Sequence, residues 1–167
     1  MKRALLFILA LVMAFSLVAC GGGSKGKTYK GTGDNKGEKL TISGKTVTVT
    51  TKETLDEDDI GMDVKMTLSG TLTGTIVDEE DDELEVEIKK VKMSMKITGD
   101  DAKEFKEMYK SMAGELDGDE KDLFEDLIDG KTITIKPDDE LWDILGVGEE
   151  TIIIELDKEE GTFEADY

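Results

Sequence analysis

Residues 62–77, MDVKMTLSGTLTGTIV, carry a regular alternation of apolar and polar side chains. The apolar residues keep one parity, and hydroxyl or charged residues keep the other. Period-two alternation over this length predicts a long β-strand with one buried face. Gly70 and Gly74 fall on the apolar parity, where glycine suits the sharp bends of a strand that wraps around a barrel. A hairpin turn at Ser69-Gly70 is the alternative.

Strand signals continue on both sides of this stretch. A Ser43-Gly44-Lys45 turn between two short apolar alternations predicts a β-hairpin. An acidic turn at 78–83 leads into a second alternating run over residues 84–97. The parity of that run slips at Lys89-Lys90, which predicts a β-bulge or a short turn there.

The chain changes period near residues 100–129. Apolar residues recur there at intervals of three and four, and Gly114 and Gly130 follow the two segments. This pattern predicts an amphipathic helical pair or one broken helix. A short helical turn is expected around Trp142. Further strands are expected at residues 133–135, 151–156 and 162–166.

About eight short strands with one helical insertion predict a mainly β fold. The expected architecture is an antiparallel up-and-down barrel or half-barrel meander, with a β-sandwich as the alternative. Residues 28–167 are expected to form one domain. The motif GKT[VI]T[VI] occurs at 44–49 and at 130–135. The repeat indicates either two copies of a strand–loop–hairpin unit or a chance similarity, since strands use few residue types.

The N-terminal residues have the layout of an export signal, since two basic residues precede an uncharged apolar run too short to span a membrane. Leu17-Val18-Ala19-Cys20 follows, and it resembles the lipobox of bacterial lipoproteins. The resemblance implies that residues 1–19 are removed as a signal peptide and that Cys20 carries a lipid anchor. Two acyl chains on one residue would hold the domain stably at the outer face of the cell membrane. An ordinary secreted protein is the alternative.

Residues 20–27 are expected to form a flexible tether. The sequence GGGSKGKT at 21–28 also matches the phosphate-loop pattern G-x-x-x-x-G-K-[ST]. That mechanism requires a buried strand before the loop and a helix after it. Here Cys20 precedes the pattern, and Tyr29-Lys30-Gly31-Thr32-Gly33 is no helix start, so the tether is the better interpretation.

The composition excludes several classes of function. The chain has no His, so it has no imidazole base, no Ser-His or Cys-His pair and no His metal ligand. Its formal charge of −19 opposes binding to nucleic acid, which depends on Lys and Arg. Removal of Lys2 and Arg3 with the signal peptide changes that charge to −21 and leaves no Arg.

Carboxylates and methionines are the remaining candidate site residues. The acidic segments at 56–59, 78–83, 117–122, 138–140 and 157–160 could bind Ca²⁺ weakly, but none fits the twelve-residue calcium loop. Solvated turns are the favoured interpretation. Met93 with Met95 and Met108 with Met112 could hold Cu(I), but core packing is favoured for all of these methionines. No catalytic residues and no cofactor are predicted, and a sugar-cleaving enzyme is disfavoured because aromatic residues are few.

The order of strands and turns over residues 28–167 resembles the small lipocalin-like lipoproteins of Gram-positive bacteria. The family's Gly-x-Trp at the first strand is absent, and Tyr29-Lys30-Gly31-Thr32-Gly33 stands in its place. The resemblance implies a barrel that takes a small hydrophobic ligand. The sequence thus predicts a non-enzymatic, membrane-anchored binding module. The alternative is a structural or protein-interaction module of the cell envelope with an acidic surface that could respond to Ca²⁺.

Overall fold

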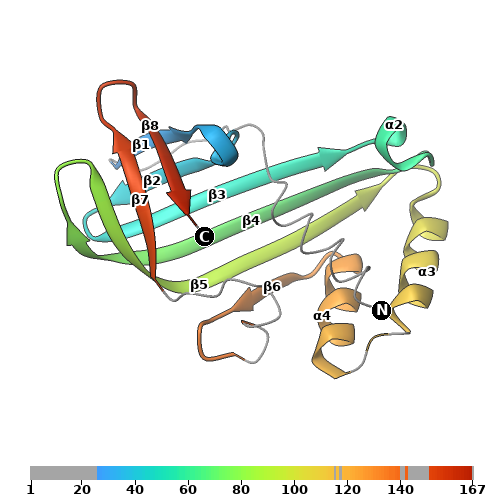
Figure 1. Ribbon diagram of the computed structural model, residues 1–167. Coiled ribbons are helices and arrows are strands. Elements are labelled where there is room, and N and C mark those ends of the chain that lie inside the picture. Colours follow the sequence, from blue (N-terminus) through green and yellow to red (C-terminus); the bar gives the residue numbers. More distant parts are fainter. Residues whose placement is uncertain (1–25, 115, 117, 140–141, 143–150, 167) are drawn as a thin grey trace.

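The computed structural model describes residues 26–114, 116, 118–139, 142 and 151–166 (Figure 1). In chain order its elements are β1 (Lys27–Gly31), the 3-10 helix η1 (Gly33–Asn35), β2 (Lys39–Ser43), β3 (Thr46–Leu55), α2 (Glu57–Ile60), β4 (Lys65–Glu79), β5 (Glu83–Thr98), α3 (Ala102–Ala113), α4 (Gly118–Ile128), β6 (Thr132–Ile135), β7 (Thr151–Asp157) and β8 (Thr162–Asp166).

The strands form a mainly β fold with a closed barrel, as the sequence predicts. Within the described residues the barrel follows the order β4-β3-β2-β1-β8-β7-β5, and β5 pairs back onto β4 to close it. All of these pairings are antiparallel except that of β1 with β8. The parallel pair has a geometric cause, because seven strands of alternating direction cannot close without one.

The three longest strands continue beyond the barrel. One edge of β5 pairs with β4 along its length, while the other edge is shared between β7 at residues 83–87 and β6 at residues 91–94. Figure 1 shows the far ends of β3, β4 and β5 extending toward α3 and α4. The helical insertion predicted near 100–129 is therefore a helix pair that covers the extended part of the sheet.

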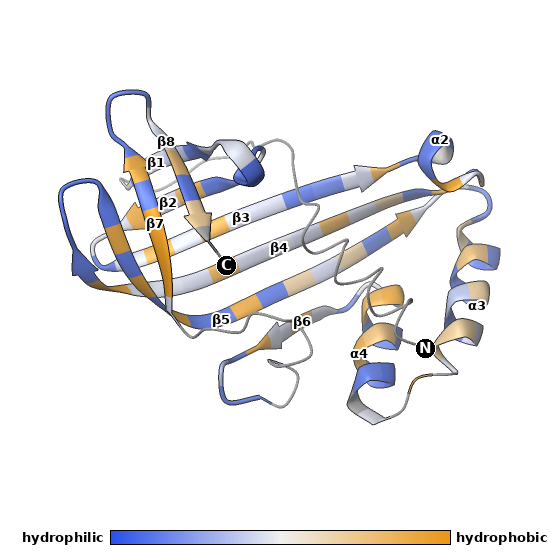
Figure 2. Cartoon of the chain, viewed as in Figure 1, coloured by the Kyte–Doolittle hydropathy of each residue, from blue (hydrophilic) through white to orange (hydrophobic). Residues whose placement is uncertain are grey.

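The change from barrel to extension coincides with a β-bulge in β5. Thr73 pairs with Lys90 and Gly74 with Ile88, so Lys89 has no partner on β4. The parity slip at Lys89-Lys90 is thus a bulge, as predicted. β4 runs unbroken through Ser69 and Gly70, which makes the alternative hairpin turn at that position wrong. Figure 2 shows the resulting bands of hydrophobic and hydrophilic residues along β4 and β5.

One continuous hydrophobic core fills both parts of the molecule. In the barrel, Leu40, Val47, Val86 and Ile154 have no exposed surface at all, which means that no space the size of a water molecule adjoins them. Side chains therefore pack closely around these four residues. Asn35 is the one buried polar residue among those described, and its amide oxygen accepts a hydrogen bond of 2.8 Å from the Ala165 amide beside the β1–β8 closure.

The helix pair packs through aromatic side chains. The Phe105 and Tyr109 rings lie 4.4 Å apart on α3, and Tyr109 lies 6.2 Å from Phe124 on α4. Because this stripe occupies the inward face of α3, Met108 and Met112 point away from it and are 45% and 49% exposed. The prediction that these two methionines pack in the core is wrong, whereas Met66, Met93 and Met95 on the strands are buried as predicted.

The two GKT[VI]T[VI] copies lie in different parts of the fold. Each begins at a glycine with positive φ, Gly44 at 61° and Gly130 at 83°. The first copy enters β3, a strand of the closed barrel, whereas the second enters β6, which pairs only with β5 outside it. The two copies therefore do not form equivalent halves of the barrel.

Candidate functional site

The inner face of the sheet changes chemistry along β3. The register places Val47, Val49, Thr51, Glu53 and Leu55 on one face. The two valines are buried in the barrel core. Beyond the barrel, the same face presents a hydroxyl and a carboxyl group where the alternation calls for apolar side chains.

The strands beside these two polar residues contribute apolar groups. Thr51 stands opposite Gly70, and a Cβ at Gly70 would lie 2.7 Å from the Thr51 methyl group, so that methyl takes the place of the missing side chain. Glu53 stands opposite Leu68. The same two rows of the register continue across β4 and β5 with Met93 and Met95.

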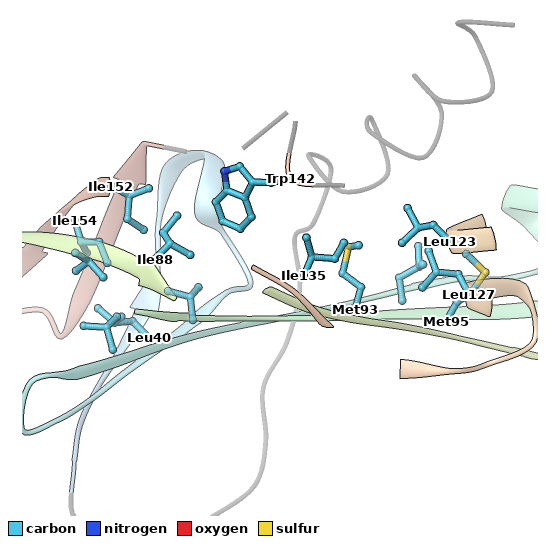
Figure 3. Close-up of a cluster of buried hydrophobic side chains, with 14 of the residues drawn as sticks. Leu40, Ile88, Met93, Met95, Leu123, Leu127, Ile135, Trp142, Ile152 and Ile154 are labelled. Carbon is cyan, nitrogen blue, oxygen red and sulfur yellow. The ribbon is translucent and has the colours of Figure 1, made fainter. Parts of the chain in front are cut away.

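Among the described residues, three buried side-chain polar atoms have no hydrogen-bond partner: Thr51 Oγ1 and Glu53 Oε2 on this face, and Trp142 Nε1. Trp142 is 4% exposed and belongs to the same hydrophobic cluster as Met93 and Ile135. In Figure 3 it lies on the same side of the strands as those residues, between them and Ile88. Buried polar groups in folded proteins are nearly always satisfied, so an unpaired donor and two unpaired oxygens need an explanation.

Burial raises the pKa of the Glu53 carboxyl, and the negative charge of Asp59 raises it further. The native state therefore holds the Glu53 proton more tightly than the unfolded chain does. Stability is lost as the pH rises from the unfolded pKa, about 4.3, through the raised native value. At neutral pH an ionised Glu53 is a cost to the fold.

Replacement of Glu53 by Gln should remove this cost. We expect Glu53→Gln to raise the free energy of unfolding at pH 7 by less than about 1 kcal/mol, because the side chain is only partly buried, and to change it less at pH 4. Urea unfolding at both pH values measures the difference. Equal effects at the two pH values would contradict a raised pKa of the Glu53 carboxyl in the native state.

A second candidate site lies at the opposite end of the barrel. The β4–β5 turn and the β7–β8 turn together form a depression of about 590 Å³. It is lined by Thr32, Glu80, Asp81, Asp82, Glu83, Glu155, Leu156, Asp157, Glu160, Thr162, Phe163 and Glu164. The structure thus brings together two of the predicted acidic segments, 78–83 and 157–160.

One lysine at the edge of the acidic depression joins its two turns. The Lys158 ammonium donates to the Asp81 carbonyl oxygen and lies 3.8 Å from an Asp82 carboxylate oxygen. The Asp157 carboxylate accepts hydrogen bonds within its own turn, from the backbone amides of Glu159 at 2.9 Å and Glu160 at 2.8 Å. Among the described residues, no group of three or more carboxylates is spaced to hold a metal ion.

The other predicted site residues are dispersed. Cys20 and most of the tether lie outside the described residues, as do parts of the acidic segments 117–122 and 138–140. The segment at 56–59 forms the start of α2, far along β3 from the acidic depression. Met93 and Met95 are buried in the core.

Sequence reasoning missed the unpaired polar atoms on the inner face. The signal was present, since Thr51 and Glu53 continue the apolar parity of Val47 and Val49. A polar residue at an inward position indicates either a satisfied core contact or a binding site.

Comparison with protein families, with characterised proteins and with solved structures gives no match. Within the described part of the chain, no helix has the length and apolarity needed to cross a membrane. The fold is a closed β-barrel with a sheet extension that a helix pair covers.

Proposed function

We propose that the chain is a membrane-anchored extracytoplasmic lipoprotein whose β domain is a non-enzymatic binding module for a small hydrophobic ligand with polar groups. The lipobox resemblance at Leu17 to Cys20 supports the anchor. The unpaired atoms of Thr51, Glu53 and Trp142 carry the binding part of the proposal. A ligand there would meet an apolar surface with a few fixed polar groups, which is the usual chemistry of small-molecule sites.

The position of the ligand follows from the packing. Side chains in the barrel such as Leu40 and Ile154 have no exposed surface, whereas Thr51 and Glu53, two of the residues with unpaired atoms, lie on β3 beyond the barrel. We therefore place the ligand against the inner face of β3 and β4 rather than within the barrel. Its polar groups would accept from the Trp142 indole N–H and donate to the Glu53 carboxylate.

A thermal-shift screen tests the proposal. The chain from Cys20 onward, with Cys20→Ser, would be melted with fatty acids, lysophospholipids, haem, oligosaccharides and divalent cations. A true ligand raises the melting temperature with the logarithm of its concentration. Thr51→Val, which replaces the hydroxyl with a methyl group, should weaken that shift. The matched control, Thr48→Val on the outer face of the same strand, should leave it unchanged.

The acidic depression favours a second function, an interaction module for a cationic envelope partner or Ca²⁺. Two separate turns converge there with only Lys158 among the described lysines paired to them. If Ca²⁺ is the partner, millimolar Ca²⁺ should raise the melting temperature. A melting temperature that does not change with Ca²⁺ would exclude Ca²⁺ as the partner and favour a cationic protein.

A further inference from the structure

The outer face of the long strands is basic and rich in hydroxyl groups, although the chain as a whole is strongly acidic. Alternation along β3, β4 and β5 places every second side chain on this face. The register sets them in cross-strand rows. The hydroxyl residues are Thr46, Thr48, Thr50, Thr54, Thr67, Ser69, Thr71, Thr73, Thr75, Ser94 and Thr98, and the lysines are Lys52, Lys65, Lys90, Lys92 and Lys96. We call this surface the Lys/Thr face.

The boundary of the Lys/Thr face is sharp. Along β5 the outward residues before the bulge are Glu83, Glu85 and Glu87, and those after it include Lys90, Lys92 and Lys96. The acidic half of β5 pairs with β7, whereas the basic half pairs with β6. The sign of the outer surface therefore changes where β5 leaves the barrel.

The acidic surface continues from the acidic half of β5 onto the neighbouring strands. That half of β5 pairs with β7, and β7 pairs with β8. These two strands carry outward acids that line the acidic depression, among them Glu155 and Glu164. Charges beyond about 8–10 Å are largely screened at physiological salt, so the lysines act locally despite the net charge.

The lysines of the Lys/Thr face are free to meet a partner. Among the described residues none of them forms an ion pair with a carboxylate. Lys52, Lys65, Lys92 and Lys96 are exposed. The outward positions of β3, β4 and the basic half of β5 hold no aromatic side chain, and their one aliphatic residue, Val77, lies at the acidic end.

This chemistry fits a broad anionic surface. Lysine is a compact point charge without the fork that reads one phosphate bidentately, and the chain beyond Arg3 has no Arg. The five lysines occupy the cross-strand rows from Lys65 to Thr73 of β4, a span of roughly 27 Å, so they are spread along the sheet rather than gathered into a pocket. Spread lysines on an open sheet suit a charged layer better than a small anion.

The position of the tether indicates which anionic surface the Lys/Thr face would meet. The chain enters β1 at Lys27, and β1 pairs with β2, which pairs with β3. Cys20 precedes Lys27 by seven residues, which reach about 25 Å when fully extended. A lipid on Cys20 would therefore keep the start of β1 close to the bilayer. There the Lys30 amide donates a hydrogen bond to the Gly161 carbonyl oxygen of the β7–β8 turn.

We propose that the Lys/Thr face rests on the anionic headgroups of the bilayer to which Cys20 anchors the chain. This inference rests on the lipid anchor of the proposed function but not on its ligand. Docked in this way, the domain turns α3 and α4, which pack against the inner face of the sheet, away from the lipid.

Site-specific labelling of the lipidated protein tests the orientation. Cys20 is the only cysteine, so Thr54→Cys on the Lys/Thr face and Ser111→Cys at an exposed position of α3 each provide one labelling position. A fluorophore at either position would be read against a headgroup quencher in vesicles with and without phosphatidylglycerol. We expect quenching at position 54 in anionic vesicles at low salt, its loss at 0.5 M NaCl, and little quenching at position 111.

Matched charge variants complete the test. Lys52→Gln, Lys92→Gln and Lys96→Gln together should lower the docked population about a hundredfold, since each lysine near an anionic membrane contributes about fivefold. The control is Lys103→Gln, Lys106→Gln and Lys121→Gln, which removes the same charge from α3 and α4. Its docking should match that of the parent chain.

Several results would overturn the proposal. Equal quenching at positions 54 and 111, or quenching that does not depend on phosphatidylglycerol, excludes docking through the Lys/Thr face. Binding to soluble polyglycerol phosphate without quenching in vesicles would assign the face to a polymer instead. Labelling of the parent chain at Cys20 would show an unmodified thiol, and would therefore report failure of the lipid anchor separately from failure of docking.

Discussion

Replacement of Cys20 by Ala is expected to move nearly all of the protein from the membrane fraction into the medium. The thiol is the only group in the lipobox-like sequence that can carry the lipid, and no described helix would hold the chain in a bilayer without it. Loss of both acyl chains removes the anchoring energy that they supply. Fractionation and immunoblotting of the expressing cells measure the distribution.

The control for this variant keeps the cysteine and changes a nearby glycine. Gly22→Ala should leave the protein in the membrane fraction, because the Leu-Val-Ala-Cys sequence is intact. The released Cys20→Ala protein should show the far-ultraviolet circular dichroism of a folded β domain. Continued retention of Cys20→Ala on the membrane would contradict the lipid anchor.

Replacement of Gly74 by Ala is expected to destabilise the barrel by about 2–3 kcal/mol. Gly74 is buried beside the β5 bulge, and a Cβ there would lie 2.4 Å from Val86 Cγ1 and 2.8 Å from the Glu87 carbonyl oxygen. Backbone of a paired strand cannot move aside cheaply. For a domain of this size we expect a fall in melting temperature of about 8–12 °C, measured by circular dichroism.

Gly70 provides the matched control on the same strand and the same face. A Cβ at Gly70 would meet only the Thr51 methyl group, 2.7 Å away, and a side-chain methyl group on β3 can shift. Gly70→Ala should therefore cost less than about 1 kcal/mol. Equal losses in the two variants would show that the bulge geometry at Gly74 is not what makes glycine necessary.

The sequence predicted the strand framework because the alternation is local. The parity of residues 62–77 and the slip at Lys89-Lys90 each correspond to a structural feature, a continuous β4 and a bulge in β5. The parallel pairing of β1 with β8 was not predictable in this way, because it depends on how many strands enter the barrel rather than on any residue in those two strands.

Side-chain surroundings were harder to predict. Met108 and Met112 fit a helical stripe by spacing, but the direction of α3 is set by Phe105 and Tyr109, which pack against α4 and leave those methionines outside. The meeting of the acidic segments 78–83 and 157–160 depends on the pairing of β5 with β7. No spacing along the chain reveals a contact between residues so far apart.

The central claim, that the inner face beyond the barrel binds a ligand, is tested most directly by the fluorescence of Trp142. It is the only tryptophan in the chain, and its indole N–H is one of the unpaired groups. Titration of a ligand from the thermal-shift screen should change the emission with saturation, and Thr51→Val should raise the dissociation constant while Thr48→Val does not. A ligand that stabilises the protein while leaving the Trp142 emission unchanged, with both variants binding equally, would contradict the account.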